Sequence, residues 1–217
     1  MIFSTIPEAI EDLKKGKMLI LLDEKREKEA DLYIPTDKLT SQMIITMIKK
    51  GGGLICVAIT QAQAHKLALP LMVDTLDNDE KTGVNFTISV NAKEGITTGV
   101  SANDRFKTIK VLANPKSLSS DLIRPGHVFG LVANSNGVLD RAGHTESAVD
   151  LARLTGLYPA GVTCEILSDN GNTAKLPDLI QLSQQLKIKI VLIEELVKYL
   201  KKNPLPKLEE PYCVVKT

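Results

Sequence analysis

The amino-acid sequence predicts an α+β protein in which a mixed β-sheet is flanked by helices, forming a single three-layer α/β/α-type domain. Segments with helical periodicity alternate with short apolar segments along most of the 217 residues, a pattern typical of strands separated by helices. The NG turn at 136–137 and the DNG turn at 169–171 add hairpins, so part of the sheet is predicted to be antiparallel. An apolar fraction of 43% supplies a sizeable core.

The predicted helices combine apolar residues at intervals of three and four with capping residues at their ends. The first has Pro7 in its opening turn and Gly16 at its end. Thr40 and Thr60 are predicted N-caps, and Ser101 opens an S-x-x-D capping pattern. The predicted helical ranges are 6–15, 40–50, 61–67, 101–113, a segment from Thr145 or Ser147 to Gly156, 177–186 and 194–202.

The predicted strands are short and apolar, except for one that alternates polar with apolar residues. They cover 17–22, 31–35, 54–60, 84–91, 128–133, 137–139, 162–167, a short return strand near Thr173, and 189–193. The polar segment 74–82 has no periodicity and is predicted to be a mobile loop. We expect residues 1–217 to form one domain, with an irregular, Pro-punctuated tail over about 204–217.

The composition excludes several classes of function. The 27 Lys and Arg residues are balanced by 26 Asp and Glu residues, which gives no general attraction to nucleic acid or to anionic membranes. Three cysteines without C-x-x-C spacing argue against both a disulfide framework and a structural zinc site. The N-terminus does not have the pattern of a signal peptide, and no apolar run reaches the ~18 residues that span a bilayer. We therefore expect a soluble, cytoplasmic protein without nucleic-acid or membrane partners.

A repeated R-x-G-H pattern, at 124–127 and 141–144, contains two of the three histidines. Arginine offers a planar fork to phosphate or carboxylate, and glycine lets a backbone approach a ligand closely. Histidine adds a titratable group or a metal ligand. A lone histidine more often caps or packs a turn, but two copies accompanied by arginines favour a site for an anionic ligand.

A run of charged residues, DEKREKEAD at 23–31, lies between two predicted strands. Such a run is often only a solvated loop or helix. Its position at the end of a buried strand favours a functional loop, because ligand chemistry is common there. The candidate groups in it are the carboxylates of Glu24, Glu27, Glu29 and Asp31 and the guanidinium of Arg26.

Two residues in predicted strands leave alternatives open. Cys56 is favoured as a small core residue over a functional thiol. Glu165 stands between Cys164 and Ile166 in an apolar strand. Either it points to solvent, or it is a buried carboxyl group with a raised pKa. The sequence pattern favours neither alternative for Glu165.

These segments together resemble the 3,4-dihydroxy-2-butanone 4-phosphate synthase family of riboflavin biosynthesis. The resemblance is carried by LDEKREKEADL at 22–32, GGGLICVAIT at 51–60, EGITTGVSANDRFKTI at 94–109, and the segment from RPGHVFGLVA to AGVTCEIL at 124–167. The blocks are spread over nearly the whole chain, which excludes a chance match of one short motif.

The resemblance implies a role for each residue that occupies a functional position of the family. A divalent metal would be held by Glu27 and His144. The substrate would be bound by Arg26, Asp31, Arg141, Ala142, Gly143, His144 and Thr145. The groups essential for catalysis or lining the reacting centre would be His127, Glu165, Glu29 and Cys56.

The resemblance also implies an activity, a cofactor and an assembly. The reaction would be a lyase-type conversion of D-ribulose 5-phosphate to L-3,4-dihydroxy-2-butanone 4-phosphate and formate. Mg²⁺ would assist it, and Mn²⁺ should also serve because an imidazole ligand is softer than magnesium usually prefers. The family works as a homodimer with active sites at the subunit interface, which would bring His127 to the site of the other subunit.

Two other functions are weighed against this one. A catalytically silent phosphosugar-binding relative is disfavoured because both metal ligands and both proton-transfer candidates are present. An added GTP cyclohydrolase II activity is disfavoured because no cysteine-ligated zinc motif occurs. Several positions differ from the usual family residues: Ala30 and Ala142 replace Gly, Gly130 replaces Pro, and Val84 and Asn85 stand where Thr and small residues are frequent. Of these, the methyl group of Ala142 would be strained if its backbone needed a positive φ.

Overall fold

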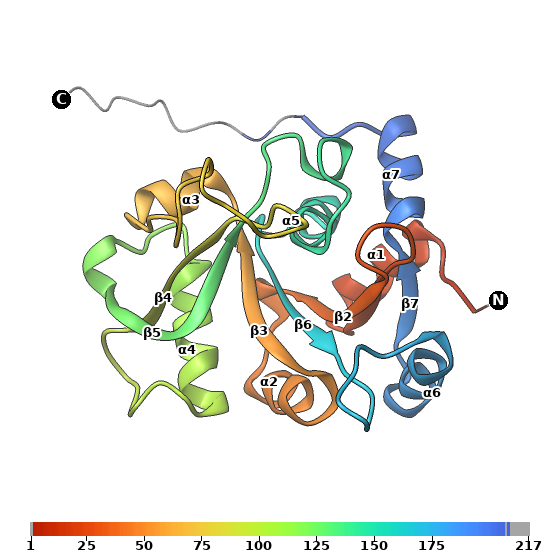
Figure 1. The fold of residues 1–217 in the computed structure, drawn as a ribbon, viewed down its shortest axis with the longest axis horizontal. Helices are drawn as coiled ribbons and strands as arrows, with labels where there is room; N and C mark the ends of the chain where they lie inside the picture. Colours follow the sequence, from red (N-terminus) through yellow and green to blue (C-terminus); the bar gives the residue numbers. More distant parts are fainter. Residues whose placement is uncertain (1, 207, 209–217) are drawn as a thin grey trace.

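The computed structural model describes residues 2–206 and 208. These residues form a mixed sheet with helices on both faces (Figure 1), which confirms the predicted fold class. The strands are β1 (Leu19–Asp23), β2 (Glu29–Pro35), β3 (Gly52–Ile59), β4 (Phe86–Ala92), β5 (Leu122–Val132), β6 (Gly161–Ile166) and β7 (Lys189–Leu192). The helices are α1 (Ile6–Lys14), α2 (Ser41–Thr46), α3 (Gln61–Lys66), α4 (Ala102–Leu112), α5 (His144–Leu154), α6 (Leu176–Leu186) and α7 (Ile193–Lys202).

The strand order in the sheet is β4-β5-β3-β6-β2-β1-β7. The pairs β1–β2, β2–β6, β3–β6 and β4–β5 are antiparallel, whereas β3–β5 and β1–β7 are parallel. The central strand β6 therefore lies between β2 and β3, which are distant from it in the sequence. This order brings the charged segment before β2 next to the end of β6.

Helices α2, α4 and α6 cover one face of the sheet, and α5 and α7 cover the other (Figure 1). Helix α5 lies directly on β2 and β6. The Tyr33 hydroxyl donates to the Ala148 carbonyl at 2.8 Å, and both groups are buried. A methyl group at Gly161 would lie 2.5 Å from the Tyr33 ring and 3.0 Å from the Ala148 side chain. This close packing holds α5 against the sheet at Ala148, one turn after the helix begins.

Local capping chemistry explains where several helices begin. The side chains of Thr40, Thr60 and Ser101 accept hydrogen bonds from the backbone N–H groups of Met43, Gln63 and Asp104. These are the three N-caps predicted from the sequence, and each satisfies an N–H that has no partner inside its helix.

The second predicted strand of the NG hairpin is wrong: residues Gly137–Leu139 form a 3-10 turn. Gly137 has a φ of 60°, and the Val138 N–H donates to Asp150 Oδ2 at 2.9 Å. Because α5 captures the turn in this way, the chain after it does not return along β5.

Three smaller differences concern the ends of elements. Helix α5 begins at His144 with Gly143 as its N-cap, earlier than either predicted start. The return strand near Thr173 is reduced to one bridge with Leu167. The last helical turn of the predicted 40–50 helix is a π turn, Met47–Gly51. The predicted irregular tail is described only at 204–206 and 208, where it has no helix or strand, and 209–217 lie outside the described residues.

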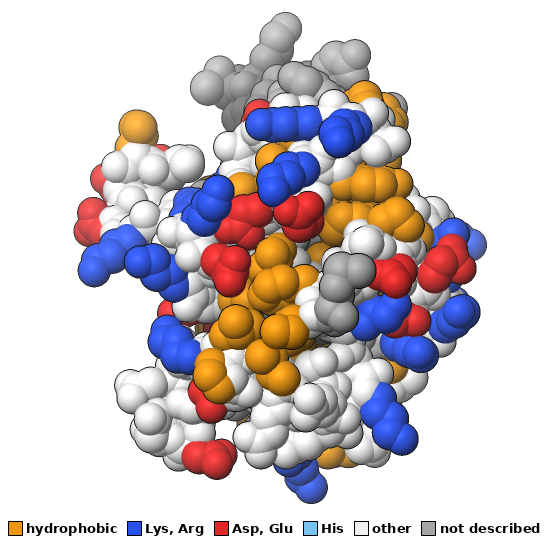
Figure 2. All heavy atoms as spheres, turned by 90° about the vertical axis from the view of Figure 1, so that its right-hand side faces the viewer, with side chains coloured by type: hydrophobic (Ala, Val, Ile, Leu, Met, Phe, Trp, Pro, Cys, Tyr) orange, Lys and Arg blue, Asp and Glu red, His pale blue; other side chains and the backbone are white. Residues whose placement is uncertain are grey.

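Strand β7 is an edge of the sheet, and the N-terminal segment covers part of it. Phe3 forms a parallel bridge with Ile190, and the Ser4 N–H donates to the Ile190 carbonyl at 2.8 Å. Figure 2, which faces the side of the molecule that carries α6, β7 and α7, shows hydrophobic side chains bordered by charged ones. Pairing and flanking charge are common ways to keep an edge strand from associating.

Candidate functional site

The turn between β1 and β2 is organised by Asp23, the last residue of β1. Its carboxylate accepts hydrogen bonds from the backbone N–H groups of Lys25 at 3.0 Å, Arg26 at 2.8 Å and Glu27 at 3.2 Å. An aspartate that binds N–H groups two and three residues later is a common turn-forming signal. Sequence reasoning did not single out Asp23 as a site residue, although it determines where Glu27 lies.

Glu27 meets His144 at the N-terminal end of α5. Glu27 Oε2 lies 2.8 Å from His144 Nδ1, and His144 Nε2 lies 3.3 Å from the Leu21 carbonyl oxygen. Asp31 Oδ1 is 4.0 Å from the same Nε2. His144 is only 6% exposed. The structure therefore brings together three predicted site residues that come from two distant parts of the chain.

The protonation of this group follows from burial and charge. Burial opposes a charge on His144, but the carboxylates of Asp31 and Glu27 outweigh it and raise the pKa of the imidazole to about 9. Both ring nitrogens face oxygen atoms, as an imidazolium with two N–H donors requires. Burial would raise the pKa of Glu27, but the hydrogen bond and charge of His144 hold it below its ordinary value.

Two further carboxyl groups, those of Asp31 and Glu29, have raised pKa values. Burial raises the pKa of Asp31 to about 7. The positive charge of His144 opposes this shift, and the negative charges of Glu165 and Glu27 add to it. Burial also raises the pKa of Glu29, again helped by Glu27 and Glu165. A carboxyl group with a pKa of about 7, as at Asp31, is suited to taking a proton from a ligand and returning it.

Arg141 connects this cluster to two other elements. Its Nη1 donates to Glu146 Oε2 at 2.6 Å, and its Nη2 lies 3.4 Å from Glu27 Oε1. A methyl group at Gly143 would lie 2.2 Å from Arg141 Nη1. The glycine of this R-x-G-H copy therefore gives room to the arginine of the same motif rather than to a ligand.

The loop tip around Thr82 lies over the two predicted substrate arginines. The Thr82 carbonyl accepts from Arg141 Nε at 3.0 Å and also from Arg26 Nη2, and its hydroxyl is 3.3 Å from Arg141 Nη2. Glu80 shapes the tip by accepting from the Thr82 N–H at 2.9 Å, the Thr82 hydroxyl at 2.7 Å and the Val84 N–H at 2.9 Å. The sequence predicted a loop here but gave no signal for either contact.

Asp31 and Glu165 lie opposite each other on neighbouring strands and share the face of the sheet that α5 covers. Cys56 lies on the same face, opposite Thr163. Glu165 is half-buried, and its Oε2 accepts from the Leu54 N–H at 2.7 Å. Glu165 therefore neither points freely into solvent nor lies in the core, the two alternatives that the sequence left open.

A bulge in β3 allows the Leu54 N–H to reach the Glu165 carboxylate. Gly52 pairs with Ile166 and Ile55 with Cys164, so Gly53 and Leu54 together lie opposite Glu165. A methyl group at Gly53 would lie 2.5 Å from Glu165 Oε2 and 2.8 Å from its backbone oxygen. Only glycine fits at this position without moving the carboxylate.

We expect Gly53→Ala to lower the free energy of unfolding by about 3 kcal/mol, because one of the overlaps involves backbone that has nowhere to move. Gly16→Ala is the matched control: its methyl group meets open space, and only its positive φ costs about 1 kcal/mol. Denaturant unfolding of both variants measures the difference. Equal losses of stability would contradict the steric role of Gly53.

Cys56 is buried, and burial raises the pKa of its thiol well above the ordinary value, with further contributions from Glu165 and Asp31. It is therefore a neutral thiol beside the carboxylates, unsuited to act as a thiolate nucleophile. The structure places it next to the site and leaves its role in catalysis a prediction.

His127 and the short residues around His144 complete the predicted set. His127 is exposed on β5, and its polar contacts within the described chain are with Asn91. Thr145 is buried in the first turn of α5. Ala142 is not among the non-glycine residues with positive φ in the described part of the chain, so its methyl group is not strained there. His127 is thus the one predicted catalytic histidine that lies apart from the Glu27–His144 pair.

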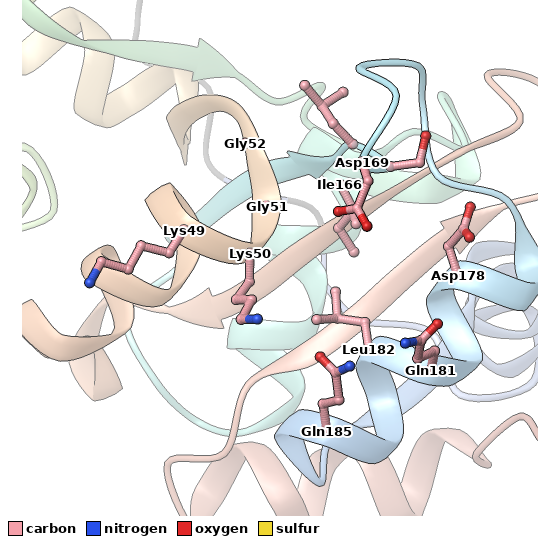
Figure 3. A pocket seen from close by; sticks show the side chains of 12 residues that line it. Lys49, Lys50, Gly51, Gly52, Ile166, Asp169, Asp178, Gln181, Leu182 and Gln185 are labelled. Atoms are coloured by element: carbon pink, nitrogen blue, oxygen red, sulfur yellow. The ribbon is translucent and has the colours of Figure 1, made fainter.

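A polar cavity of about 390 Å³ lies between the π turn after α2 and helix α6, on the opposite side of the sheet from the site (Figure 3). Residues Lys50–Gly52 form one wall, and Asp178, Gln181 and Gln185 of α6 form another. Ile166 also lines it and points away from the sheet face that carries Glu165. None of the predicted site residues lines this cavity.

The donor set at Glu27 and His144 fits a divalent cation. Within the described residues no three His, Cys, Asp or Glu side chains are grouped as a complete metal site. A carboxylate and an imidazole that face each other at 2.8 Å are nevertheless suitable ligands, provided the imidazole loses its proton. Magnesium commonly takes one or two protein ligands and completes its coordination with water and substrate oxygens.

A mixed sheet with carboxylates, an imidazole and two guanidinium groups gathered at one end defines a class of protein that can bind a divalent cation together with an anionic ligand. Comparison with known proteins identifies the family within that class. The family model described as 3,4-dihydroxy-2-butanone 4-phosphate synthase matches residues 7–199, and the chain belongs to this family.

Individual relatives agree with this assignment. A 3,4-dihydroxy-2-butanone 4-phosphate synthase of Vibrio cholerae is 45% identical over 89% of this chain and 88% of its own length. A riboflavin biosynthesis protein of Aquifex aeolicus is 48% identical over 91% of this chain but only 49% of its own length. The chain spans about half the length of several curated relatives, and 39% of one from rice.

A solved structure shares the fold closely. It is described as 3,4-dihydroxy-2-butanone 4-phosphate synthase in complex with two magnesium ions, and it is 35% identical with a TM-score of 0.87. The match covers 92% of this chain and 98% of that one. Separately, none of the helices within the described residues is both long and apolar enough to cross a membrane.

Proposed function

We propose that this protein converts D-ribulose 5-phosphate to L-3,4-dihydroxy-2-butanone 4-phosphate and formate, with Mg²⁺ as cofactor. The observation that supports this most strongly is the meeting of Glu27, His144 and Arg141, with Asp31 beside them. Family membership and the magnesium ions of the related solved structure support the same assignment.

The phosphate of the substrate is bound by guanidinium groups and by the start of α5. Arg141 and Arg26 both point their N–H groups at the Thr82 carbonyl, an oxygen that substrate oxygens replace. The first N–H groups of α5 have no partners inside the helix and add donors at the positive end of its dipole. Gly143 and Thr145 lie at this end of the helix. Ala142 connects Arg141 to Gly143 and so belongs to the same binding segment.

Glu27 and His144 would hold the cation, which when bound would polarise a ketose carbonyl and lower the pKa of neighbouring hydroxyl groups. Mn²⁺ also serves, because imidazole suits it at least as well as Mg²⁺. Asp31, with a pKa of about 7, accepts a proton from a sugar hydroxyl and returns it later. Glu29 and Glu165 lie near Asp31 and complete the carboxyl groups of the site, and Cys56 contributes a neutral thiol beside them.

The assembly and location are part of the proposal. The protein acts as a homodimer in the cytoplasm, and residues 1–217 form one synthase unit. The exposed position of His127, apart from Glu27 and His144, supports a role for it in the site of the second subunit.

The direct test supplies purified protein with Mg²⁺ and ribulose 5-phosphate and measures formate. We expect formate to accumulate with turnover, and the same reaction with chelator to release none. Absence of formate from the magnesium-loaded protein would refute the activity. If calorimetry then showed tight binding of ribulose 5-phosphate, a silent phosphosugar-binding protein would replace the synthase as the conclusion.

Metal binding is expected to release a proton from His144. Because the imidazole pKa is raised to about 9, His144 is protonated at pH 7 and neutral well above pH 9, and only the neutral form binds a cation. Mg²⁺ affinity should therefore rise from pH 7 to 9, with about one proton released at pH 7 and fewer as the pH increases. Calorimetry in buffers with different ionisation enthalpies counts these protons. A proton count that does not change with pH would contradict this.

A further inference from the structure

Strand β5 leaves its regular pairing with β4 just before His127. Val90 is opposite Val128, whereas Asn91, the next residue, is opposite Ile123, so residues 124–127 bulge out of the ladder. Two β4 side chains hold this bulge. The Gly126 N–H donates to Ser89 Oγ at 3.1 Å, and the His127 N–H donates to Asn91 Oδ1 at 2.9 Å.

The backbone around Asn91 fixes the orientation of its amide. A peptide N–H only donates, so the Asn91 atom 2.9 Å from the His127 nitrogen is the oxygen. A peptide carbonyl only accepts, and the other end of the amide, Nδ2, lies 3.4 Å from the Thr98 oxygen. Asn91 is 4% exposed, and a methyl group at Gly99 would lie 2.2 Å from Nδ2. The packed amide cannot turn over.

This orientation determines what the imidazole of His127 meets. Asn91 Nδ2 lies 3.1 Å from His127 Nδ1. One hydrogen of Nδ2 points to Thr98, which leaves the other for the ring nitrogen. A proton on Nδ1 would face that hydrogen directly, so the contact with Nδ2 is a hydrogen bond only if Nδ1 accepts. The Asn91 oxygen can accept a second hydrogen bond, but it lies farther from Nδ1, at 3.3 Å, and already accepts from the His127 N–H at 2.9 Å. The shorter contact with Nδ2 therefore sets the role of Nδ1.

We infer that Asn91 is a positioning residue that holds neutral His127 as the tautomer with its proton on Nε2. The ring then presents an N–H donor on its exposed side and no basic nitrogen. Resting on the proposed function, this makes His127 a hydrogen-bond donor to an oxygen that becomes negative during enolisation. Proton abstraction falls to the carboxyl groups, Asp31 among them.

Histidine ¹⁵N NMR of the protein tests the tautomer without reference to activity. At about pH 8.5, above the ordinary range of histidine titration, we expect His127 Nδ1 to resonate as an unprotonated nitrogen and Nε2 as a protonated one. The His127→Ala spectrum assigns the signals. In Asn91→Asp a carboxylate replaces the donor, so Nδ1 should move to the protonated position.

Ser89→Ala is the matched control, since it removes the other anchor of the same bulge and leaves the imidazole contact intact. Its His127 signals should match the wild type. A protonated Nδ1 in the wild type, or no change in Asn91→Asp, would overturn the inference whether or not the protein releases formate.

Kinetics test the consequence for turnover. Loss of one donor to a developing oxyanion typically costs about 100-fold in kcat. We expect Asn91→Asp to show that loss with KM changed less than about twofold, and Ser89→Ala to keep kcat within about threefold of the wild type. Equal kcat in Asn91→Asp and the wild type would overturn the donor role.

Discussion

We expect the His144→Ala protein to release formate at least about 1000-fold more slowly than the wild type, which corresponds to about 4 kcal/mol of transition-state stabilisation. The substitution removes the imidazole that faces Glu27 at 2.8 Å and, with it, one of the two proposed protein ligands for the cation. The fold should survive, because Glu27 keeps Arg141 as a partner at 3.4 Å. Formate assays and thermal unfolding measure both effects.

His65→Ala is the matched control, because His65 is an exposed histidine on α3 and has no part in the site. It should keep full activity. Glu27→Gln preserves the shape of the other ligand and removes its charge, so it should lose turnover and, by calorimetry, Mg²⁺ binding. Full activity in His144→Ala or Glu27→Gln would show that the metal is held elsewhere.

The second large effect is recovery of activity when two inactive proteins are mixed. If His127 serves the site of the other subunit, a dimer of His127→Ala with His144→Ala has one complete site and one that lacks both histidines. Random exchange makes half of the dimers mixed, so about one quarter of wild-type activity should return. Formate release after co-refolding, across a series of mixing ratios, measures this.

The control for that experiment mixes His144→Ala with Glu27→Gln. Both changes fall in the same half of the site, so this mixture should stay inactive. Recovery in the control, or none in the His127 and His144 mixture at any ratio, would contradict a shared site.

Locally determined features were predictable from the sequence. The N-caps at Thr40, Thr60 and Ser101 were predicted because the capping residue and its N–H partner are three residues apart. The buried strands were predicted because continuous apolar runs mark them. The strand predicted after the NG pair at 136–137 is wrong because Asp150, a residue distant in the sequence, accepts a hydrogen bond from the turn and holds it in another conformation.

The site was predictable only in part. Glu27 and Asp31 share one charged segment, but the sequence spacing says nothing about their meeting with His144, 117 residues from Glu27, and that expectation came from the family resemblance. Contacts between residues far apart in the sequence gave no sequence signal at all. These contacts are the Thr82 carbonyl with Arg141, the β3 bulge at Gly53 with Glu165, and the Asn91 amide with His127.

The glycines of the two R-x-G-H copies are required by the structure, but for a different reason than the sequence suggested. Both were expected to admit a ligand. A methyl group at Gly126 would lie 1.9 Å from a backbone atom of Val90, so this glycine lets two strands approach each other. Gly143 gives room to Arg141. In both cases the protein itself, rather than a substrate, requires the absent side chain.

Because the loop tip at Thr82 already occupies the two arginines, a ligand that binds them must replace existing hydrogen bonds. Arg141 and Arg26 already donate to a carbonyl oxygen, and Glu80 holds the tip that carries it. An incoming anion therefore gains only the difference between its own hydrogen bonds and those it displaces. If phosphate binds at these arginines as proposed, a dianionic phosphate would gain more from that exchange than a neutral sugar, and the contacts of Thr82 would favour retention of the charged ligand.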